Sequence, residues 1–246
     1  MSTMAPLSAE TMKNFLYAST ATVSMQMLKR GFRNCAISGV RPLNPQAVRL
    51  VGPAYTLRYI PSREDLDKPP SPSDPPNAQR TAIEESPAGC VLVIATESNT
   101  RSGTLGDILA LRLKARGIAG VLSDGAMRDT PVIGKFDFPV YCAAAAAPPS
   151  MANLRPIEVQ TPVGIRGVPV YPGDVIVADE DGAIVVPRPI ADEVARDSFE
   201  QERLEKFVAI RIGQGREIIG VYPPNDQTKK DYAAWIAAGE PATWPA

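Results

Sequence analysis

The stretch Gly103–Pro131, GTLGDILALRLKARGIAGVLSDGAMRDTP, contains the signals of one helix and one strand, with charged residues at one end of each. The helix begins at Gly106-Asp107, and Gly117 can end it because glycine tolerates the left-handed conformation found after many helices. A broad apolar face is expected on this helix, formed by Ile108, Leu109, Leu111, Leu113 and Ala115. Residues 118–122 then predict a short strand that is buried on both faces. A helix that leads into such a strand is typical of an α/β protein.

The charged residues of this stretch predict a ligand site. In open α/β sheets, anions bind where helix N-termini and the carboxyl ends of strands meet. Gly106 would let a ligand approach the backbone, and Arg128 adds a fixed positive charge. Asp129 would repel an anion unless a hard divalent cation such as Mg²⁺ lay between them. The alternative is that Asp107 only caps the helix while Arg128 and Asp129 form a surface ion pair, and local chemistry leaves both interpretations open.

The chain contains no histidine. Its absence excludes Ser-His-Asp and Cys-His activation of a nucleophile, zinc sites built from histidine, and a phosphohistidine. Acid–base chemistry must therefore fall to carboxylates, lysine, tyrosine or a water molecule. Lys114 is a poor candidate for a Schiff base, because it lies in the last turn of the predicted helix, away from the Gly106 end.

Composition limits the class of protein without defining it. A chain of 246 residues, 44% of them hydrophobic, can bury a full core. A net charge of −1 and a pI near 5.7 give no overall attraction to nucleic acid or to an anionic membrane. The sequence has no bilayer-length apolar run and no signal-peptide pattern at its start, so we expect a cytoplasmic protein. Cys35, Cys90 and Cys142 are widely spaced and predict buried free thiols.

Hydrophobic patterns predict most of the remaining elements. Residues 4–31 are expected to form two helices that bury Met12, Phe15, Leu16, Val23, Met25, Met27 and Leu28. Strands are expected at 51–60, 91–95, 140–142, 157–159, 168–170, 175–178 and 183–186. A charged amphipathic helix is expected at 190–212, and a last helix near 228–238.

Two polar segments interrupt these patterns. Residues 63–80, REDLDKPPSPSDPPNAQR, are crowded with proline and charge and predict a long exposed excursion: a lid, an oligomer contact or a solvated loop. The three acids at 179–181 resemble a metal site, but Asp181-Gly182 suits a turn, so we expect a hairpin tip with all three acids in solvent. We therefore expect a single domain over 1–246, with a proline-rich insertion at 61–80 and a C-terminal helical extension from about residue 190.

Gly106-Asp107 and the run ARGIAGVLSDGAMRD (115–129) resemble the RraA-like family, which contains the 4-hydroxy-4-methyl-2-oxoglutarate aldolases and the regulator of ribonuclease activity. The resemblance extends over nearly the whole chain, through TATVSMQMLKRG (20–31), ISGVRPLNP (37–45), LVGPAYTLRYIPSREDL (50–66), VPVYPGDVIVADEDGAIVVP (168–187) and GREIIGVYPP (215–224). It implies an α/β/β sandwich with a central β-barrel-like sheet, related to the swivelling phosphohistidine domains. It also implies a homotrimer or a dimer of trimers, with active sites between subunits.

The resemblance also implies roles for individual residues. The backbone of four consecutive residues would bind the carboxylate of the substrate; they are Gly106, Asp107, Ile108 and Leu109. Arg128 would contact the substrate oxygen and stabilise an enolate. Asp129 would be the one direct protein ligand of a divalent metal, Mg²⁺ or Mn²⁺.

Two further roles follow from the same resemblance. Asp107 would help a water molecule to remove the hydroxyl proton of the substrate. Glu205, or else Glu202, would approach the metal of a neighbouring subunit without binding it directly.

These roles imply a metal-dependent lyase that cleaves a small 4-hydroxy-2-oxo acid to pyruvate by retro-aldol chemistry. Oxaloacetate decarboxylation is expected as a side activity, because both reactions pass through the enolate of pyruvate. Two alternatives stay open: a non-catalytic regulator that binds a ribonuclease, and a sugar-acid dehydratase or hydrolase that uses the same metal site. The insertion after Arg63 and the C-terminal extension make the chain longer than the compact aldolases, which leaves the natural substrate open.

Overall fold

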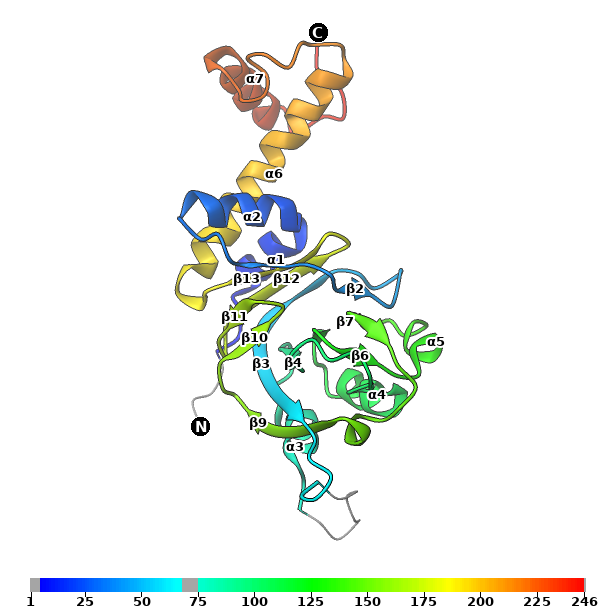
Figure 1. Ribbon diagram of the computed structural model, residues 1–246. Coiled ribbons are helices and arrows are strands. Elements are labelled where there is room, and N and C mark those ends of the chain that lie inside the picture. Colours follow the sequence, from blue (N-terminus) through cyan, green and yellow to red (C-terminus); the bar gives the residue numbers. More distant parts are fainter. Residues whose placement is uncertain (1–4, 68–74, 246) are drawn as a thin grey trace.

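The computed structural model describes residues 5–67 and 75–245 and has the expected α/β class (Figure 1). Its centre is a nine-stranded mixed sheet with the order β1-β13-β12-β3-β4-β5-β7-β2, and β9 pairs with β3 beside this path. Within the described residues the end strands β1 and β2 do not pair, so the barrel-like sheet stays open. The strands are β1 Ala36–Ile37, β2 Arg41–Pro42, β3 Leu50–Pro61, β4 Val91–Ala95, β5 Gly120–Ser123, β7 Val140–Cys142, β9 Leu154–Val159, β12 Val175–Asp179 and β13 Gly182–Val186.

The parallel part of the sheet, β3-β4-β5-β7, forms the core under the site. Every residue of β4 is buried, as the continuous apolar run predicts. Alternate residues of β4 point to opposite faces of the sheet. On one face, Leu92 and Ile94 pack with the helices α3 (Ala78–Glu85) and α4 (Asp107–Ala115). On the other face, Val91 and Val93 pack with the hairpin of β10 (Val163–Ile165) and β11 (Val168–Val170). Helix α4 and strand β5 therefore form the predicted helix–strand unit.

Helix α4 ends as predicted, with Gly117 at a φ of +76° after it, but its apolar face is narrower than predicted. Only Ala110 and Leu113 are fully buried. Ile108 and Leu111 are 77% and 54% exposed, so the predicted broad apolar face is not buried over its whole width. The helix touches the sheet along one stripe, and the residues on either side of that stripe face solvent.

The first two predicted helices are confirmed as α1 (Ala9–Tyr17) and α2 (Thr20–Lys29). Three of the seven positions expected to be buried are exposed instead: Leu16, Met25 and Leu28. Helix α1 packs on β3 and α6 (Ala191–Gly213), and α2 packs on β12, β13 and α6, so only one stripe of each helix meets the core. The three cysteines are buried and unpaired, as expected, and burial raises the pKa of the Cys90 thiol to about 12.

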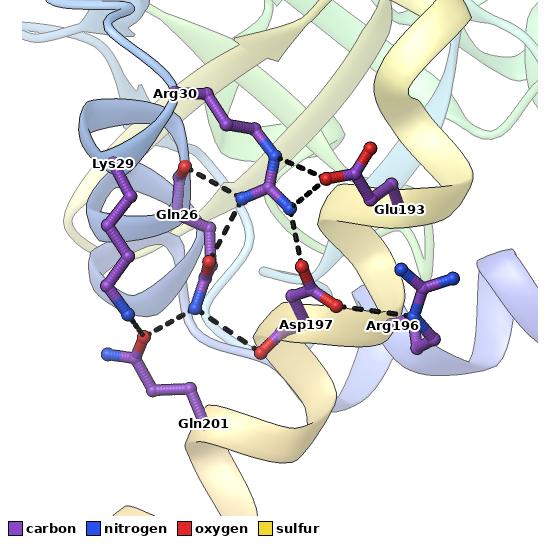
Figure 2. Close-up of polar contacts among 7 residues, drawn as sticks. All are labelled: Gln26, Lys29, Arg30, Glu193, Arg196, Asp197 and Gln201. Carbon is purple, nitrogen blue, oxygen red and sulfur yellow. Dashed lines mark hydrogen bonds and ion pairs between the residues drawn. The ribbon is translucent and has the colours of Figure 1, made fainter.

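A polar network joins the end of α2 to α6 (Figure 2). Arg30 contacts Glu193 at 2.7 Å and Asp197 at 2.5 Å, and Gln26 donates to Gln201 at 2.6 Å. These groups are partly exposed, so each ion pair contributes only about 0–1 kcal/mol to stability. The network fixes the direction in which α6 leaves the body of the protein.

The second half of α6 extends away from the sheet, and α7 (Asp226–Ala237) lies beside its far end (Figure 1). The ring of Phe207 lies 5.6 Å from that of Trp235 in α7 and 6.3 Å from that of Trp244. Neither Phe207 nor Trp235 belongs to the three apolar clusters that surround the sheet in the described part of the chain. We call residues 207–245 the arm.

The insertion predicted at 61–80 is only partly described, because residues 68–74 lie outside the described ranges. The last residues of the insertion form the start of helix α3, which the polar composition of this segment did not predict. Asn77 caps this helix by accepting a hydrogen bond from the N–H of Arg80 at 3.0 Å. No helix in the described ranges combines the length and the apolar character needed to cross a bilayer.

The acidic hairpin forms as predicted between β12 and β13, but Asp179 is not in solvent. Its carboxylate accepts hydrogen bonds from the N–H and hydroxyl of Thr20 at 2.8 and 2.6 Å, and it pairs with Arg49 at 3.0 Å. Burial alone would raise the pKa of Asp179, but the hydrogen bonds from Thr20 and from the N–H of Asp181, together with the charge of Arg49, lower it below its usual value. Asp179 thus joins the hairpin to the start of α2.

We expect Asp179→Ala to lower the free energy of unfolding by about 2–3 kcal/mol near neutral pH, because Arg49 and the start of α2 lose a charged partner. A carboxyl whose pKa is lowered in the folded state stabilises the fold above its ordinary pKa of about 4, and this stabilisation is lost as the pH falls through the lower, folded value. Urea unfolding followed by circular dichroism at decreasing pH measures this dependence.

Glu180→Ala is the matched control, because the Glu180 side chain is exposed at the tip of the same hairpin. The control should keep the stability of the wild type within about 0.5 kcal/mol. Equal stability of Asp179→Ala and Glu180→Ala near neutral pH would contradict the role given to Asp179.

Candidate active site

The loop 103–106 and strand β6 (Ala126–Met127) lie side by side and bring the two predicted charged groups together. The N–H of Thr104 donates to the carbonyl of Ala126 at 2.9 Å, and the N–H of Arg128 donates to the carbonyl of Leu105 at 2.9 Å. A Cβ on Gly103 would lie 2.7 Å from the backbone nitrogen of Arg128, so these two backbones can approach this closely only because residue 103 is glycine.

Gly106 is the N-cap of α4, and no side chain caps this end of the helix. A Cβ at Gly106 would lie 2.6 Å from Oδ2 of Asp129, so the carboxylate of Asp129 lies directly against the start of the helix. Asp107 occupies the first turn, and its Oδ1 accepts a hydrogen bond from the N–H of Ile108 at 2.8 Å. In this arrangement the Asp107 carboxylate uses one of the N–H groups expected to bind the substrate. The exposed side chain of Ile108 contributes nothing to the site, which is consistent with a role for its backbone alone.

Asp129 links β6 to the short helix α5 (Thr130–Ile133) with a φ of +56°. Aspartate is one of the few non-glycine residues that adopt this left-handed conformation without a large cost in energy. Its Oδ2 lies 3.4 Å from Nε of Arg128, and both side chains are about two-fifths exposed. The predicted ion pair therefore exists, although a pair this exposed adds little to stability. Nε of Arg128 is buried and has no hydrogen-bond partner among the described residues.

A cavity of about 440 Å³ opens beside this pair. Arg128 and Asp129 contribute its charged side chains, and the rest of its lining is small or apolar: Met127, Thr130, Pro131, Ala145, Ala146 and Ala147. A cavity of this size holds a small organic acid. The alanine run, which the sequence placed only near a strand, thus forms part of the cavity wall.

Asp124 follows β5 and holds the turn after β4, and sequence reasoning missed it. It is fully buried, and it accepts hydrogen bonds from the N–H of Thr96 at 2.7 Å and the N–H of Ser98 at 2.8 Å. Glu97 and Ser98 both have a positive φ, so this tight reversal after β4 depends on the carboxylate. The signal in the sequence was an aspartate at the end of an otherwise apolar strand, since a buried charge needs hydrogen-bond partners.

The donor set at Asp129 fits a divalent cation that keeps most of its water ligands. In the described part of the chain no group of three or more acidic or cysteine side chains could hold a metal. Asp129 offers one carboxylate, placed against a glycine that leaves room beside it. Mg²⁺ commonly binds proteins through one or two carboxylates and retains water in its other positions.

Glu205 and Glu202 are not brought to this site within one chain. Both lie on α6: Glu205 accepts a hydrogen bond from Gln201 at 2.8 Å, and Glu202 accepts one from the N–H of Ser19 at 3.2 Å. Helix α6 packs on α1 and α2 rather than on α4. A role for either glutamate at the metal therefore depends on a second subunit, and it stays tied to the expected homotrimer or dimer of trimers.

Comparison with known protein families matches residues 20–185 to the RraA-like family, described as Aldolase/RraA. Protein DlpA of Legionella pneumophila is 26% identical over 202 residues, which make up 80% of this chain and 30% of DlpA. A 4-hydroxy-4-methyl-2-oxoglutarate aldolase of Thermus thermophilus is 37% identical over 110 residues, which make up 45% of this chain and 66% of that protein. The chain thus spans about a third of the length of DlpA and about two thirds of the length of the aldolase.

A solved structure extends the likeness to the fold. RraAS2 of Streptomyces coelicolor, described as an unusual member of the RNase ES inhibitor RraA protein family, has a TM-score of 0.74 and 32% identity, covering 84% of this chain and 99% of that one. The fold and the matched residues define an α/β protein whose candidate site lies between a helix start and a strand end. The chain belongs to the RraA-like family, as its sequence predicted. The matched range contains the whole candidate site and stops before α6.

Proposed function

We propose that this protein is a divalent-metal-dependent lyase that cleaves a small 4-hydroxy-2-oxo acid to pyruvate. The observation that carries the proposal is that a fixed cation and a lone carboxylate, Arg128 and Asp129, line one cavity and lie against Gly106 at a helix N-terminus. The name of the Thermus relative supports the same reaction class. Asp129 would hold Mg²⁺ or Mn²⁺, and such a cation, when bound, polarises the carboxylate and the 2-oxo group of the substrate.

The residues of the chain have separate tasks in this reaction. The backbone N–H groups at the start of α4 bind the substrate carboxylate, helped by the helix dipole. For this the Asp107 side chain must turn away from the N–H of Ile108, which it occupies here. Once turned, it can accept the proton of the 4-hydroxyl group through a water molecule. Arg128, whose Nε has no hydrogen-bond partner among the described residues, stabilises the negative charge that develops on the 2-oxo oxygen as the bond breaks.

A comparison of two reactions tests this division of tasks. Purified protein with Mg²⁺ should release pyruvate from oxaloacetate above the rate of the metal alone, and EDTA should remove the excess. Asp107→Asn should slow aldol cleavage by about 10²-fold or more, but oxaloacetate decarboxylation by less than about tenfold, because only the aldol substrate must lose a hydroxyl proton. A coupled lactate dehydrogenase assay measures pyruvate in both cases.

The outcome that would contradict the proposal is equally specific. Equal losses in the two reactions would remove Asp107 from the proton-transfer role. No pyruvate from oxaloacetate or from a panel of 4-hydroxy-2-oxo acids would remove the lyase itself.

A regulatory role is the second candidate, favoured by the similarity to RraAS2 over nearly the whole length of that chain. In this role the protein would bind a ribonuclease through its surface and would not need the cavity. Inhibition of a ribonuclease by both the wild type and Asp129→Ala, without pyruvate release, would support regulation over catalysis.

A further inference from the structure

Gln79 connects the first turn of α3 to the loop that begins α4. Its side-chain Nε2 donates a hydrogen bond to the carbonyl of Thr104 at 2.5 Å. Gln79 is half-buried, and Thr104 is fully buried. The two residues belong to separate segments, so the contact exists only in the folded protein.

The hydrogen bond adds a side-chain contact to a loop whose backbone already bonds to β6 and, through the N–H of Gly103, to the carbonyl of Pro148 at 2.9 Å. On one side, Thr104 and Leu105 bond to β6 through their backbones. On the other side, Gln79 is the donor that satisfies the Thr104 carbonyl among the described hydrogen bonds. A buried carbonyl without a donor costs about 1–3 kcal/mol, so the loop would move to find one if Gln79 lost its amide.

The Tyr59 hydroxyl on β3 is also buried near Gln79, but it has no hydrogen-bond partner among the described residues. Burial raises the pKa of this hydroxyl well above the ordinary value, so it stays protonated. Among the described residues, the Gln79 amide therefore bonds to the loop and not to Tyr59.

We propose that Gln79 is a positioning residue that sets the direction of the N–H groups at the start of α4, and thereby the affinity for the carboxylate of the 2-oxo acid. This inference rests on the proposed function. Gly106 and Asp107 follow Thr104 directly in the chain, so a displacement of the Thr104 carbonyl reaches them first.

The proposal predicts an effect on substrate binding rather than on the chemical step. The substrate carboxylate keeps its charge throughout the reaction, so contacts to it stabilise the ground state and the transition state alike. Loss of such contacts raises KM and leaves kcat nearly unchanged. We expect Gln79→Met, which keeps the length of the side chain and removes the donor, to raise KM for oxaloacetate about tenfold and to change kcat less than about threefold.

Three proteins are compared with the wild type, all loaded with Mg²⁺. Gln79→Met removes the donor, and Gln79→Glu replaces it with an acceptor that faces the Thr104 carbonyl, so its KM should rise further. Glu84→Gln is the control: it weakens the ion pair of α3 with Arg112 at 2.7 Å, but Glu84 does not contact the loop. Calorimetric titration with pyruvate gives a binding constant that does not depend on turnover, and thermal unfolding shows that each variant is folded.

A parallel rise in KM and in the Kd for pyruvate in both Gln79 variants, with the control unchanged, supports the positioning role. Wild-type values in Gln79→Met overturn it, and so does an equal rise in Glu84→Gln, which would show a general effect of α3 packing. A wild type that neither binds pyruvate nor decarboxylates oxaloacetate overturns the proposed function, and the inference falls with it.

Discussion

The Asp129→Ala variant is expected to lose pyruvate release almost completely while it keeps its fold. A bound divalent cation contributes several kcal/mol to charge stabilisation, and each ~1.4 kcal/mol is a factor of ten, so the rate should fall by about 10³-fold or more. Within the described ranges no group of three or more acidic or cysteine side chains could hold the metal in place of Asp129. Addition of Mg²⁺ or Mn²⁺ should no longer stimulate the variant.

A second variant at Asp129 is needed because alanine could also disturb the backbone at this position. Asp129 has a φ of +56°, a conformation that alanine adopts less readily than aspartate or asparagine. Asp129→Asn removes the charge and tolerates this backbone, so it separates loss of the metal ligand from local strain. Both variants should fail alike in steady-state assays at increasing Mn²⁺ concentration. Metal-stimulated turnover by Asp129→Asn close to the wild-type rate would show that Asp129 is not the ligand.

Arg128→Lys is expected to reduce kcat by about 10²-fold, with a smaller change in KM. Lysine keeps the positive charge but loses the planar guanidinium, and its single ammonium group cannot reproduce the direction of Nε beside Asp129. An interaction that strengthens as charge develops on the substrate oxygen acts on kcat. The measurement is the full dependence of rate on oxaloacetate concentration.

The contrast with Gln79→Met makes this result informative. If Arg128 only held the carboxylate of the substrate, Arg128→Lys would raise KM at constant kcat, as expected for the Gln79 variant. Opposite patterns in the two variants would separate the group that stabilises developing charge from the group that orders the binding loop. A constant kcat in Arg128→Lys would limit Arg128 to substrate binding.

The helix and strand of residues 103–131 were predictable because local signals define them: Gly117 ends α4, and a short apolar run forms β5. The family was predictable from the same residues. The contact between Gly106 and Asp129 was expected only from general rules about α/β sheets. It arises from backbone hydrogen bonds between the loop and β6, which no pattern of side chains indicates.

The errors of the sequence analysis have a common physical cause. Apolar periodicity does not give the width of the contact a helix makes, so it predicted a broad apolar face on α4 of which Ile108 and Leu111 are exposed. Polar composition likewise does not show which charges meet a partner, so Asp179 was expected in solvent although Thr20 and Arg49 surround it. The contact of Gln79 was not predicted for the same reason, because only the tertiary fold brings Gln79 to Thr104.

The arm at the end of α6 determines what an optical measurement of this protein reports. The chain has two tryptophans, Trp235 and Trp244, and both lie in the arm beside Phe207. Their fluorescence therefore follows the environment of the arm, whose contacts are local in the chain, and not that of the sheet or the cavity. A fluorescence melting curve can show the loosening of a peripheral helical unit while the site is still intact. Quenching by a ligand in the cavity would imply that the arm of another subunit lies close to it.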